Sequence, residues 1–103
     1  MRTVIVRYKL KPDRVAENEE LVRAVYEELK DTQPSGLRYA TLQLDDGVSF
    51  VHLAETADGD NPLPKVAAFQ RFQQEIADRC EEQPVVTPVN VVGSFNLLED
   101  RQA

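Results

Sequence analysis

The spacing of apolar positions divides the chain into alternating and helical stretches. Apolar and polar residues alternate over residues 3–10, which predicts a half-buried strand. Apolar residues then recur every three or four positions from residue 13 to about residue 32, which predicts an amphipathic helix ended by the Pro-Ser-Gly at 34–36. A second helical pattern covers residues 66–80, and residues 85–98 return to a strand pattern.

The middle of the chain predicts a β-hairpin. Two runs rich in apolar, β-branched and aromatic residues, within residues 37–55, flank Asp45-Asp46-Gly47. With Asp46 and Gly47 as the loop, the strand register follows from the turn. The pairs are then Arg38 with Glu55, Tyr39 with Ala54, Ala40 with Leu53, Thr41 with His52, Leu42 with Val51 and Gln43 with Phe50.

The order strand, helix, hairpin, helix, strand predicts an α+β fold. Two right-handed crossovers around a hairpin give the ferredoxin-like βαββαβ plan, a four-stranded antiparallel sheet with two helices on one face. We expect residues 1–98 to form a single domain of this kind and residues 99–103 to be a polar C-terminal tail.

Both faces of the predicted sheet are apolar, although two helices can cover only one of them. In the hairpin one phase contains Leu42, Val51 and Leu53, and the other contains Tyr39, Phe50 and Ala54. A second copy of the chain would cover the remaining face. We therefore expect a homodimer formed through the helix-free face of the sheet.

Charge and composition narrow the range of partners. The formal net charge is −6, so nucleic-acid binding, which depends on clustered Lys and Arg, is not expected. No apolar run is long enough to span a bilayer, and we expect no membrane partner and a cytoplasmic location. The single cysteine, Cys80, and the absence of ligand spacing predict no metal site.

Three short stretches carry a resemblance to a known family. They are Thr-Val-Ile-Val-Arg-Tyr-Lys-Leu-Lys-Pro-Asp at 3–13, Pro-Ser-Gly-Leu-Arg-Tyr at 34–39, and Phe50-Val51 with Glu55. Together with the element order they resemble the antibiotic biosynthesis monooxygenase (ABM) superfamily of dimeric α+β barrels. The resemblance implies a dimeric barrel with a pocket between the sheet and the helices of each subunit. The family includes cofactor-independent oxygenases of polyphenols and quinols, haem-degrading enzymes, and proteins with no assigned activity.

The sequence departs from the haem-degrading members of that family. It has no Trp and one His, and its first strand reads Val-Ile-Val-Arg-Tyr without the Asn that those members carry. Thr56 stands where an aromatic residue often follows the glutamate of the third strand. We therefore expect no haem and no other cofactor.

His52 is the candidate catalytic residue, because it alone titrates near neutrality without help. As a general base it would ionise a phenol, and the resulting anion could react with oxygen. The alternative is a structural histidine hydrogen-bonded to Thr41. If His52 faces a cavity beside a tyrosine, the enzyme hypothesis gains support.

The aromatic side chains of the strands and the second helix are candidate ligand contacts, and ordinary core packing is the alternative. Two functions remain open: a cofactor-independent monooxygenase of a small hydrophobic aromatic or quinol, or a non-enzymatic dimeric module for small-ligand binding or assembly. The predicted ligand-binding residues are Tyr8, Tyr39, Phe50, Phe69 and Phe72.

Overall fold

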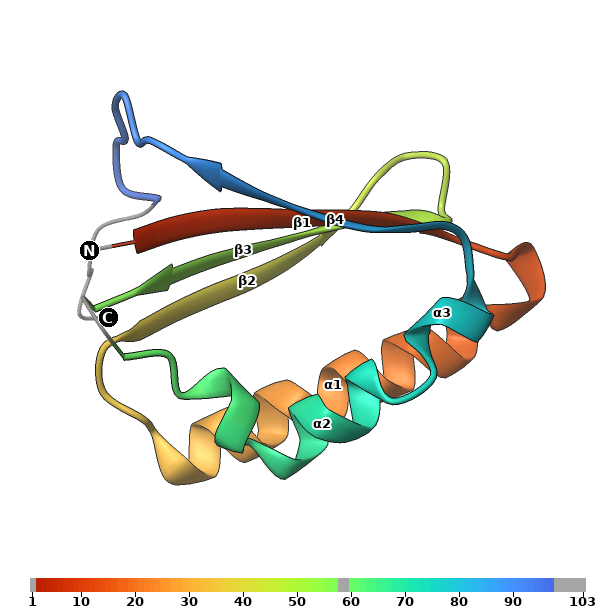
Figure 1. Cartoon of the computed structure of the whole chain (residues 1–103), viewed down its shortest axis with the longest axis horizontal. Helices are drawn as coiled ribbons and strands as arrows, with labels where there is room; N and C mark the ends of the chain where they lie inside the picture. The colour runs from red at the N-terminus through yellow and green to blue at the C-terminus, as the bar shows by residue number, and fades with distance from the viewer. Residues whose placement is uncertain (1, 58–59, 98–103) are drawn as a thin grey trace.

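The chain forms one four-stranded antiparallel sheet with its helices on one side (Figure 1). The computed structural model describes residues 2–57 and 60–97. The strand order is β2-β3-β1-β4, which confirms the predicted ferredoxin-like plan. The elements are β1 (Arg2–Leu10), η1 (Pro12–Arg14), α1 (Val15–Thr32), β2 (Leu37–Gln43), β3 (Ser49–Thr56), η2 (Leu63–Lys65), α2 (Ala67–Gln73), α3 (Ile76–Arg79) and β4 (Cys80–Val89).

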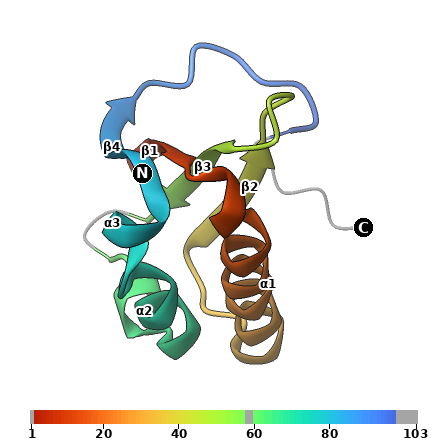
Figure 2. The same ribbon diagram turned by 90° about the vertical axis from the view of Figure 1, so that its right-hand side faces the viewer.

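The core lies between the sheet and the helices. Seen from the end of the sheet, α1, α2 and α3 all cover the same face (Figure 2). The other face carries no helix in the described part of the chain. The buried apolar side chains between the two layers are Tyr8, Leu10, Val25, Phe50, Val66, Ala68, Phe72 and Cys80.

The hairpin has the predicted register but a longer loop. Arg38 pairs with Glu55 and Thr41 with His52, as predicted. The turn closes one residue earlier than predicted, because the Gly47 N–H donates to the Leu44 carbonyl. Gly47 follows with a positive φ of 77°. Since Leu44 and Ser49 still face each other, the longer loop leaves the strand register unchanged.

The second helix is not the continuous segment that the sequence predicts over residues 66–80. It is divided into α2 and α3 at residues 74–75. The side chain of Arg79 donates from Nη2 to the carbonyl oxygen of Phe72 at 2.6 Å. In an uninterrupted helix that carbonyl would accept from the N–H of Ile76. A tertiary contact therefore replaces a helical hydrogen bond at the break.

The last strand was predicted over residues 85–98, and the structure corrects both ends. It starts at Cys80, which pairs with Leu10, and it stops at Val89, which pairs with Thr3. The described part of the neighbouring strand β1 begins at Arg2, one residue before Thr3, so it extends no further than residue 90 along this segment. Residue 98 and the predicted polar tail, residues 99–103, lie outside the described residues.

Apolar side chains are exposed on the helix-free side. Leu42 on β2 is 55% exposed and Val85 on β4 is 62% exposed, although both are large and hydrophobic. Residues 90–97 leave β4 and cross on this side of the sheet (Figure 2). This segment adds the exposed side chains of Val91, Val92, Phe95 and Leu97.

Candidate functional site

His52 lies on the helix-facing side of the sheet. Side chains alternate along β3, so His52 shares a face with Phe50 and Ala54, and all three are buried. The imidazole is 4% exposed. The sequence left the face of His52 open, and the structure assigns it to the core side.

Both nitrogen atoms of the His52 ring make hydrogen bonds. Nε2 lies 2.7 Å from the hydroxyl oxygen of Tyr8 on β1. Nδ1 lies 2.7 Å from the hydroxyl oxygen of Tyr39 and 3.2 Å from Oγ1 of Thr41, both on β2. The hydroxyl of Tyr26 on α1 bonds the same Thr41 oxygen at 2.8 Å. The hydrogen bond to Thr41 that is expected of a structural histidine is present. Hydrogen bonds to Tyr8 and Tyr39 accompany it.

Burial keeps this cluster uncharged near pH 7. Burial lowers the pKa of His52 to about 4, because the charged imidazolium is disfavoured away from water. Burial also raises the pKa of Tyr8 and of Tyr39, since the phenolate form loses its hydration in the same way. The cluster therefore consists of neutral groups that donate and accept hydrogen bonds.

Aromatic rings surround His52. The rings of Tyr8 and Phe50 stack with centroids 5.7 Å apart, and Phe72 lies 5.3 Å from the imidazole. Phe69 meets Tyr39 edge-on at 6.4 Å. The structure thus brings all five predicted ligand-binding aromatics together around the predicted base. Phe50 and Phe72 are 3% and 5% exposed, as core packing requires.

A carboxylate on α1 positions α2, the helix that carries Phe69 and Phe72. Glu28 accepts hydrogen bonds from the backbone N–H of Ala67 at 3.1 Å and of Ala68 at 2.9 Å. These N–H groups are free at the first turn of α2, and Glu28 satisfies them from another helix. The cap fixes α2 against α1 and so places Phe69 and Phe72 over the sheet.

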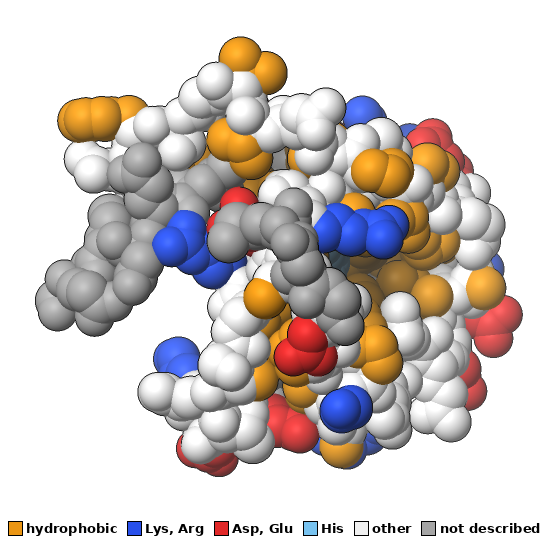
Figure 3. Space-filling view, turned by 60° about the vertical axis from the view of Figure 1, so that its left-hand side comes forward, with side chains coloured by type: hydrophobic (Ala, Val, Ile, Leu, Met, Phe, Trp, Pro, Cys, Tyr) orange, Lys and Arg blue, Asp and Glu red, His pale blue; other side chains and the backbone are white. Residues whose placement is uncertain are grey.

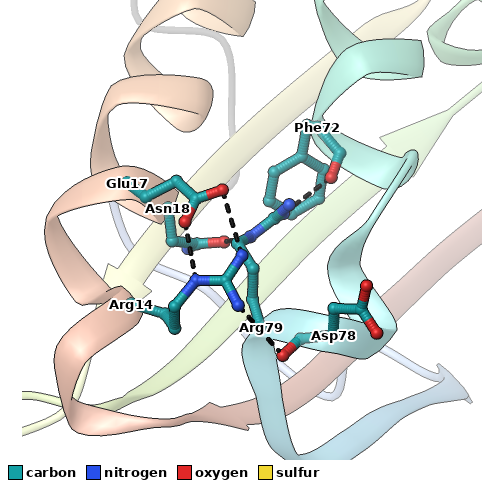
Figure 4. Close-up of polar contacts among 6 residues, drawn as sticks. All are labelled: Arg14, Glu17, Asn18, Phe72, Asp78 and Arg79. Carbon is teal, nitrogen blue, oxygen red and sulfur yellow. Dashed lines mark hydrogen bonds and ion pairs between the residues drawn. The ribbon is translucent and has the colours of Figure 1, made fainter.

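Two buried polar residues, which the sequence analysis did not single out, extend the cluster. Asn18 on α1 donates from Nδ2 to the Tyr8 hydroxyl at 3.0 Å, and Arg79 donates from Nε to Asn18 Oδ1 at 3.1 Å. Figure 4 shows the Arg79 side chain extended between Asn18 and Phe72. The available signal was a polar residue at position 18 in helical phase with Val22 and Val25.

A groove opens at the end of the molecule where α1 stops. Its volume is about 670 Å³. Figure 3 looks onto this end and shows hydrophobic side chains in the hollow with charged side chains at its edge. The described lining residues are Tyr26, Leu29, Lys30, Gln33, Pro34, Gly36, Leu37, Arg38, Tyr39, Glu55, Thr56 and Ala57.

Tyr39 connects the groove to the histidine cluster. It lines the groove and also bonds His52. The other predicted site residues do not line this groove. Tyr26 lines it as well, and the sequence analysis did not name that residue as a site candidate. Of the predicted site residues, Tyr39 is therefore the one that joins the groove to His52, which does not itself line the groove.

The predicted strand pair Arg38 and Glu55 forms part of the groove wall. Arg38 Nη1 lies 3.5 Å from Glu55 Oε1, and Thr3 Oγ1 donates to Glu55 Oε2 at 3.4 Å. Both contacts are long, so the Glu55 carboxylate is held loosely although its side chain is 9% exposed. Charge of both signs is thus present in the wall of a groove that has both polar and apolar lining residues.

Two further classes of site are not found in the described residues. Within residues 2–57 and 60–97, no three His, Cys, Asp or Glu side chains are grouped so that they could hold a metal ion. No helix in the same ranges has the length and apolar character needed to cross a membrane.

Solved structures share this fold, although no family model and no curated protein matches the sequence. An antibiotic biosynthesis monooxygenase is 20% identical, with a TM-score of 0.69 over 90% of this chain and 100% of that one. SnoaB, a cofactor-independent oxygenase from Streptomyces nogalater, in a mutant form, is 17% identical, with a TM-score of 0.64 over 92% and 96%. NE2512, a protein of unknown function from Nitrosomonas europaea, is 14% identical, with a TM-score of 0.70 over 91% of each chain.

Proposed function

We propose, from the premise that this chain has an antibiotic biosynthesis monooxygenase-like fold, that it is a cofactor-independent monooxygenase of a small hydrophobic aromatic or quinol. One observation supports this most. Tyr39 lines a groove of about 670 Å³, and its hydroxyl bonds a buried neutral histidine at 2.7 Å. A volume of that size is typical of small-molecule sites.

The reaction requires an ionised substrate and molecular oxygen. A phenol and O₂ give a quinone and water: one oxygen atom is added to the ring, and the other leaves with the phenolic and ring hydrogens. The substrate itself supplies the electrons. Ionising the phenol, whose proton leaves to water, is the step that the protein can assist: a hydrogen bond from Tyr39 would stabilise the phenolate, and His52 supports that bond by its own contact with Tyr39.

Burial determines how His52 can assist. With a pKa of about 4 the ring holds an extra proton weakly at pH 7. Its neutral form still hydrogen-bonds strongly inside the core. Direct proton uptake by His52, the role predicted from the sequence, stays a prediction. Contact of the ligand with Tyr8, Phe50, Phe69 and Phe72 stays a prediction, since these residues lie behind Tyr39 and do not line the groove. A cytoplasmic location is part of the proposal.

The proposal includes a homodimer through the helix-free face. Leu42 and Val85 on that face are more than half exposed, and the segment over it adds Phe95 at 86% and Leu97 at 73%. Exposed apolar side chains gathered on one side are typical of a protein–protein interface. A second copy seated there would bury on the order of 1,500 Å² in total.

A ligand-binding module without catalysis is the second candidate, and the burial of His52 favours it. The ring is 4% exposed and both of its nitrogen atoms already have partners. A group in that position can stabilise the core and shape the groove wall without taking part in a reaction. The groove would then bind its ligand and release it unchanged.

Oxygen consumption distinguishes the two candidates. Wild type, His52→Ala and the exposed control Gln73→Ala are each given a panel of hydroquinones of one to three rings in an oxygen electrode. The monooxygenase proposal predicts catalysed uptake in the wild type and in Gln73→Ala and its loss in His52→Ala. Equal uptake in all three would remove His52 from the mechanism. Saturable calorimetric binding with no catalysed uptake in the wild type would contradict the enzyme and support the module.

A further inference from the structure

We infer that a hydrogen-bond chain beginning at the buried Arg79 points its donors toward Tyr39, so that the groove offers its ligand a hydroxyl hydrogen. The ligand would then be an aromatic compound with an acceptor oxygen, either a quinone carbonyl or an ionised phenol. The inference rests on the proposed function only in placing the ligand in the groove.

The direction of the chain is fixed at its buried end. Arg79 is 1% exposed, and a guanidinium can only donate hydrogen bonds. Its Nε donates to Asn18 at 3.1 Å, so the Asn18 atom that faces it must be the carbonyl oxygen Oδ1. Figure 4 shows this contact and the second bond, from Arg79 to the Phe72 carbonyl. The amide orientation of Asn18 therefore follows from its neighbour.

Asn18 passes the direction on to Tyr8. With Oδ1 on Arg79, the NH₂ group of Asn18 faces the Tyr8 hydroxyl at 3.0 Å and must donate to it. Tyr8 is 2% exposed, and its own hydroxyl hydrogen needs an acceptor. Among the described residues that acceptor is Nε2 of His52, at 2.7 Å. Nε2 therefore carries no hydrogen.

The tautomer of His52 follows from this bond. A neutral imidazole has one N–H, so an unprotonated Nε2 places the hydrogen on Nδ1. Nδ1 then donates to the Tyr39 hydroxyl at 2.7 Å and, more weakly, to Thr41 at 3.2 Å. A charged ring would donate from both nitrogens and leave the Tyr8 hydrogen without this acceptor. The neutral Nδ1–H form satisfies every partner.

Tyr39 ends the chain at the groove. Its oxygen accepts from His52, and the neighbouring Thr41 oxygen, which also contacts Tyr26 and His52, is the internal acceptor that a ligand oxygen would replace. Because Tyr39 lines the groove, the proposal is that its hydroxyl hydrogen turns to an acceptor oxygen of a ligand bound there. Each donor along the chain strengthens the next, and the buried positive charge of Arg79 is at its start. Tyr39 is then a specificity-determining donor, and Arg79, Asn18 and His52 are positioning residues.

The tautomer can be measured without any ligand. In the ¹⁵N spectrum of wild-type protein labelled at histidine, the single His gives one pair of ring signals. We expect Nδ1 in the range of a protonated ring nitrogen and Nε2 in the range of an unprotonated one at pH 7. The opposite assignment, or two protonated nitrogens, would overturn the inference. Because this measurement uses no substrate, it stands or fails separately from oxygenase activity.

An isosteric change at Asn18 should reverse the chain. Asn18→Asp replaces the NH₂ group with an oxygen. One carboxylate oxygen then stays beside Arg79, and the other accepts a hydrogen bond from the Tyr8 hydroxyl. Tyr8 would then accept from His52 Nε2–H, and the ring hydrogen would move to Nε2. Gln73→Glu adds the same charge at an exposed position of α2 and should leave the tautomer unchanged. An unchanged tautomer in folded Asn18→Asp would count against the direction argued here.

A chromophoric phenol tests the groove end of the chain. 4-Nitrophenol is titrated with acid and base in excess wild-type protein, and its ionisation is followed by absorbance. Donation from Tyr39 should lower the pKa of the bound phenol by about one unit. A shift of that size means that the anion binds about tenfold tighter than the neutral phenol. Tyr39→Phe should return the bound pKa to the free value. A raised pKa in the wild type would show that Tyr39 accepts rather than donates. If the ligand is instead a quinone, its carbonyl oxygen accepts the hydrogen bond, and 1,4-naphthoquinone should bind the wild type about tenfold tighter than Tyr39→Phe.

Discussion

The Nδ1 atom of His52 lies 2.7 Å from the hydroxyl oxygen of Tyr39, so a side chain buried in the core contacts one that lines the groove. The two residues come from the adjacent strands β2 and β3, where Tyr39 pairs with Ala54 and His52 with Thr41. A contact held between two paired strands is suited to orienting a small ligand.

Removing the Tyr39 hydroxyl should impair function in a protein that stays folded but is less stable by about 1–3 kcal/mol, because a buried His52 N–H loses its nearer partner. Tyr39→Phe keeps the ring and its packing against Phe69 but removes the hydrogen bond that reaches the ligand oxygen. A hydrogen bond to a charged oxygen contributes about 1.5–3 kcal/mol, so we expect kcat/KM for hydroquinone oxidation to fall about 10- to 100-fold. Steady-state oxygen uptake measures it. Tyr26→Phe, in the same groove wall but bonded to Thr41, is the control. A larger loss in Tyr26→Phe than in Tyr39→Phe would contradict the assignment.

Burial of His52 should make stability depend on pH in a defined window. The pKa of His52 is about 4 in the folded chain and 6.5 in the unfolded one, so the unfolded state binds more protons between these values. The free energy of unfolding should therefore decrease as the pH falls from 6.5 to 4, by about 3 kcal/mol from this group alone. Urea unfolding of wild type and His52→Gln at pH 7 and pH 4.5 isolates the effect, since the carboxylates are common to both. Parallel pH dependences of the two proteins would show that His52 is not buried.

The cap supplied by Glu28 should be measurable as stability. Glu28→Ala leaves the first N–H groups of α2 without their acceptor and should lower the free energy of unfolding by about 1 kcal/mol. Glu27→Ala changes the adjacent carboxylate, which makes no such bond to α2, and is the control. Urea titrations at pH 7 compare the two. A loss of the same size in both variants would mean that the charge, and not the cap, was responsible.

Two adjacent valines on β4 test the dimer interface. Val85 and Val86 are 62% and 60% exposed, but they pair with Arg7 and Val6 and so point to opposite faces of the sheet. Val85→Lys places a charge on the helix-free face and should convert a dimer to a monomer. Val86→Lys places it on the other face and should leave the dimer intact. Sedimentation velocity at micromolar concentration gives the masses. A wild type that sediments as a folded monomer would refute the interface.

Local pattern was sufficient to predict the hairpin, but not the second helix. The register from Arg38–Glu55 to Gln43–Phe50 followed from the turn and the alternation, because a slip by one residue would reverse every side chain. The break at residues 74–75 has another cause, the bond between Arg79 and the Phe72 carbonyl. The apolar pattern does not contain this bond, because Arg79 is held in place by Asn18, which lies on α1. Similarly, the end of β4 is set by where β1 begins, and not by the valines that continue the pattern.

The candidate site was predicted by residue type but not by connection. His52 and the aromatic residues were identified because few side chains in the sequence titrate near pH 7 or stack on a ligand. Their partners Asn18 and Arg79 are 34 and 27 positions from His52 along the chain. Only the packing of α1 and α3 on the sheet brings them to Tyr8 and to each other. The location of the groove also depends on how α1 ends beside β2.

The most direct test is whether a ligand in the groove is detected at His52 through Tyr39. Wild-type protein labelled with ¹⁵N at histidine is titrated with 1,4-naphthohydroquinone under nitrogen, and the ring signals of His52 are followed. We expect a saturable shift in the wild type that is absent in Tyr39→Phe, although both bind the ligand by calorimetry. Binding to the wild type without any change at His52, or an equal shift in Tyr39→Phe, would contradict this role of Tyr39.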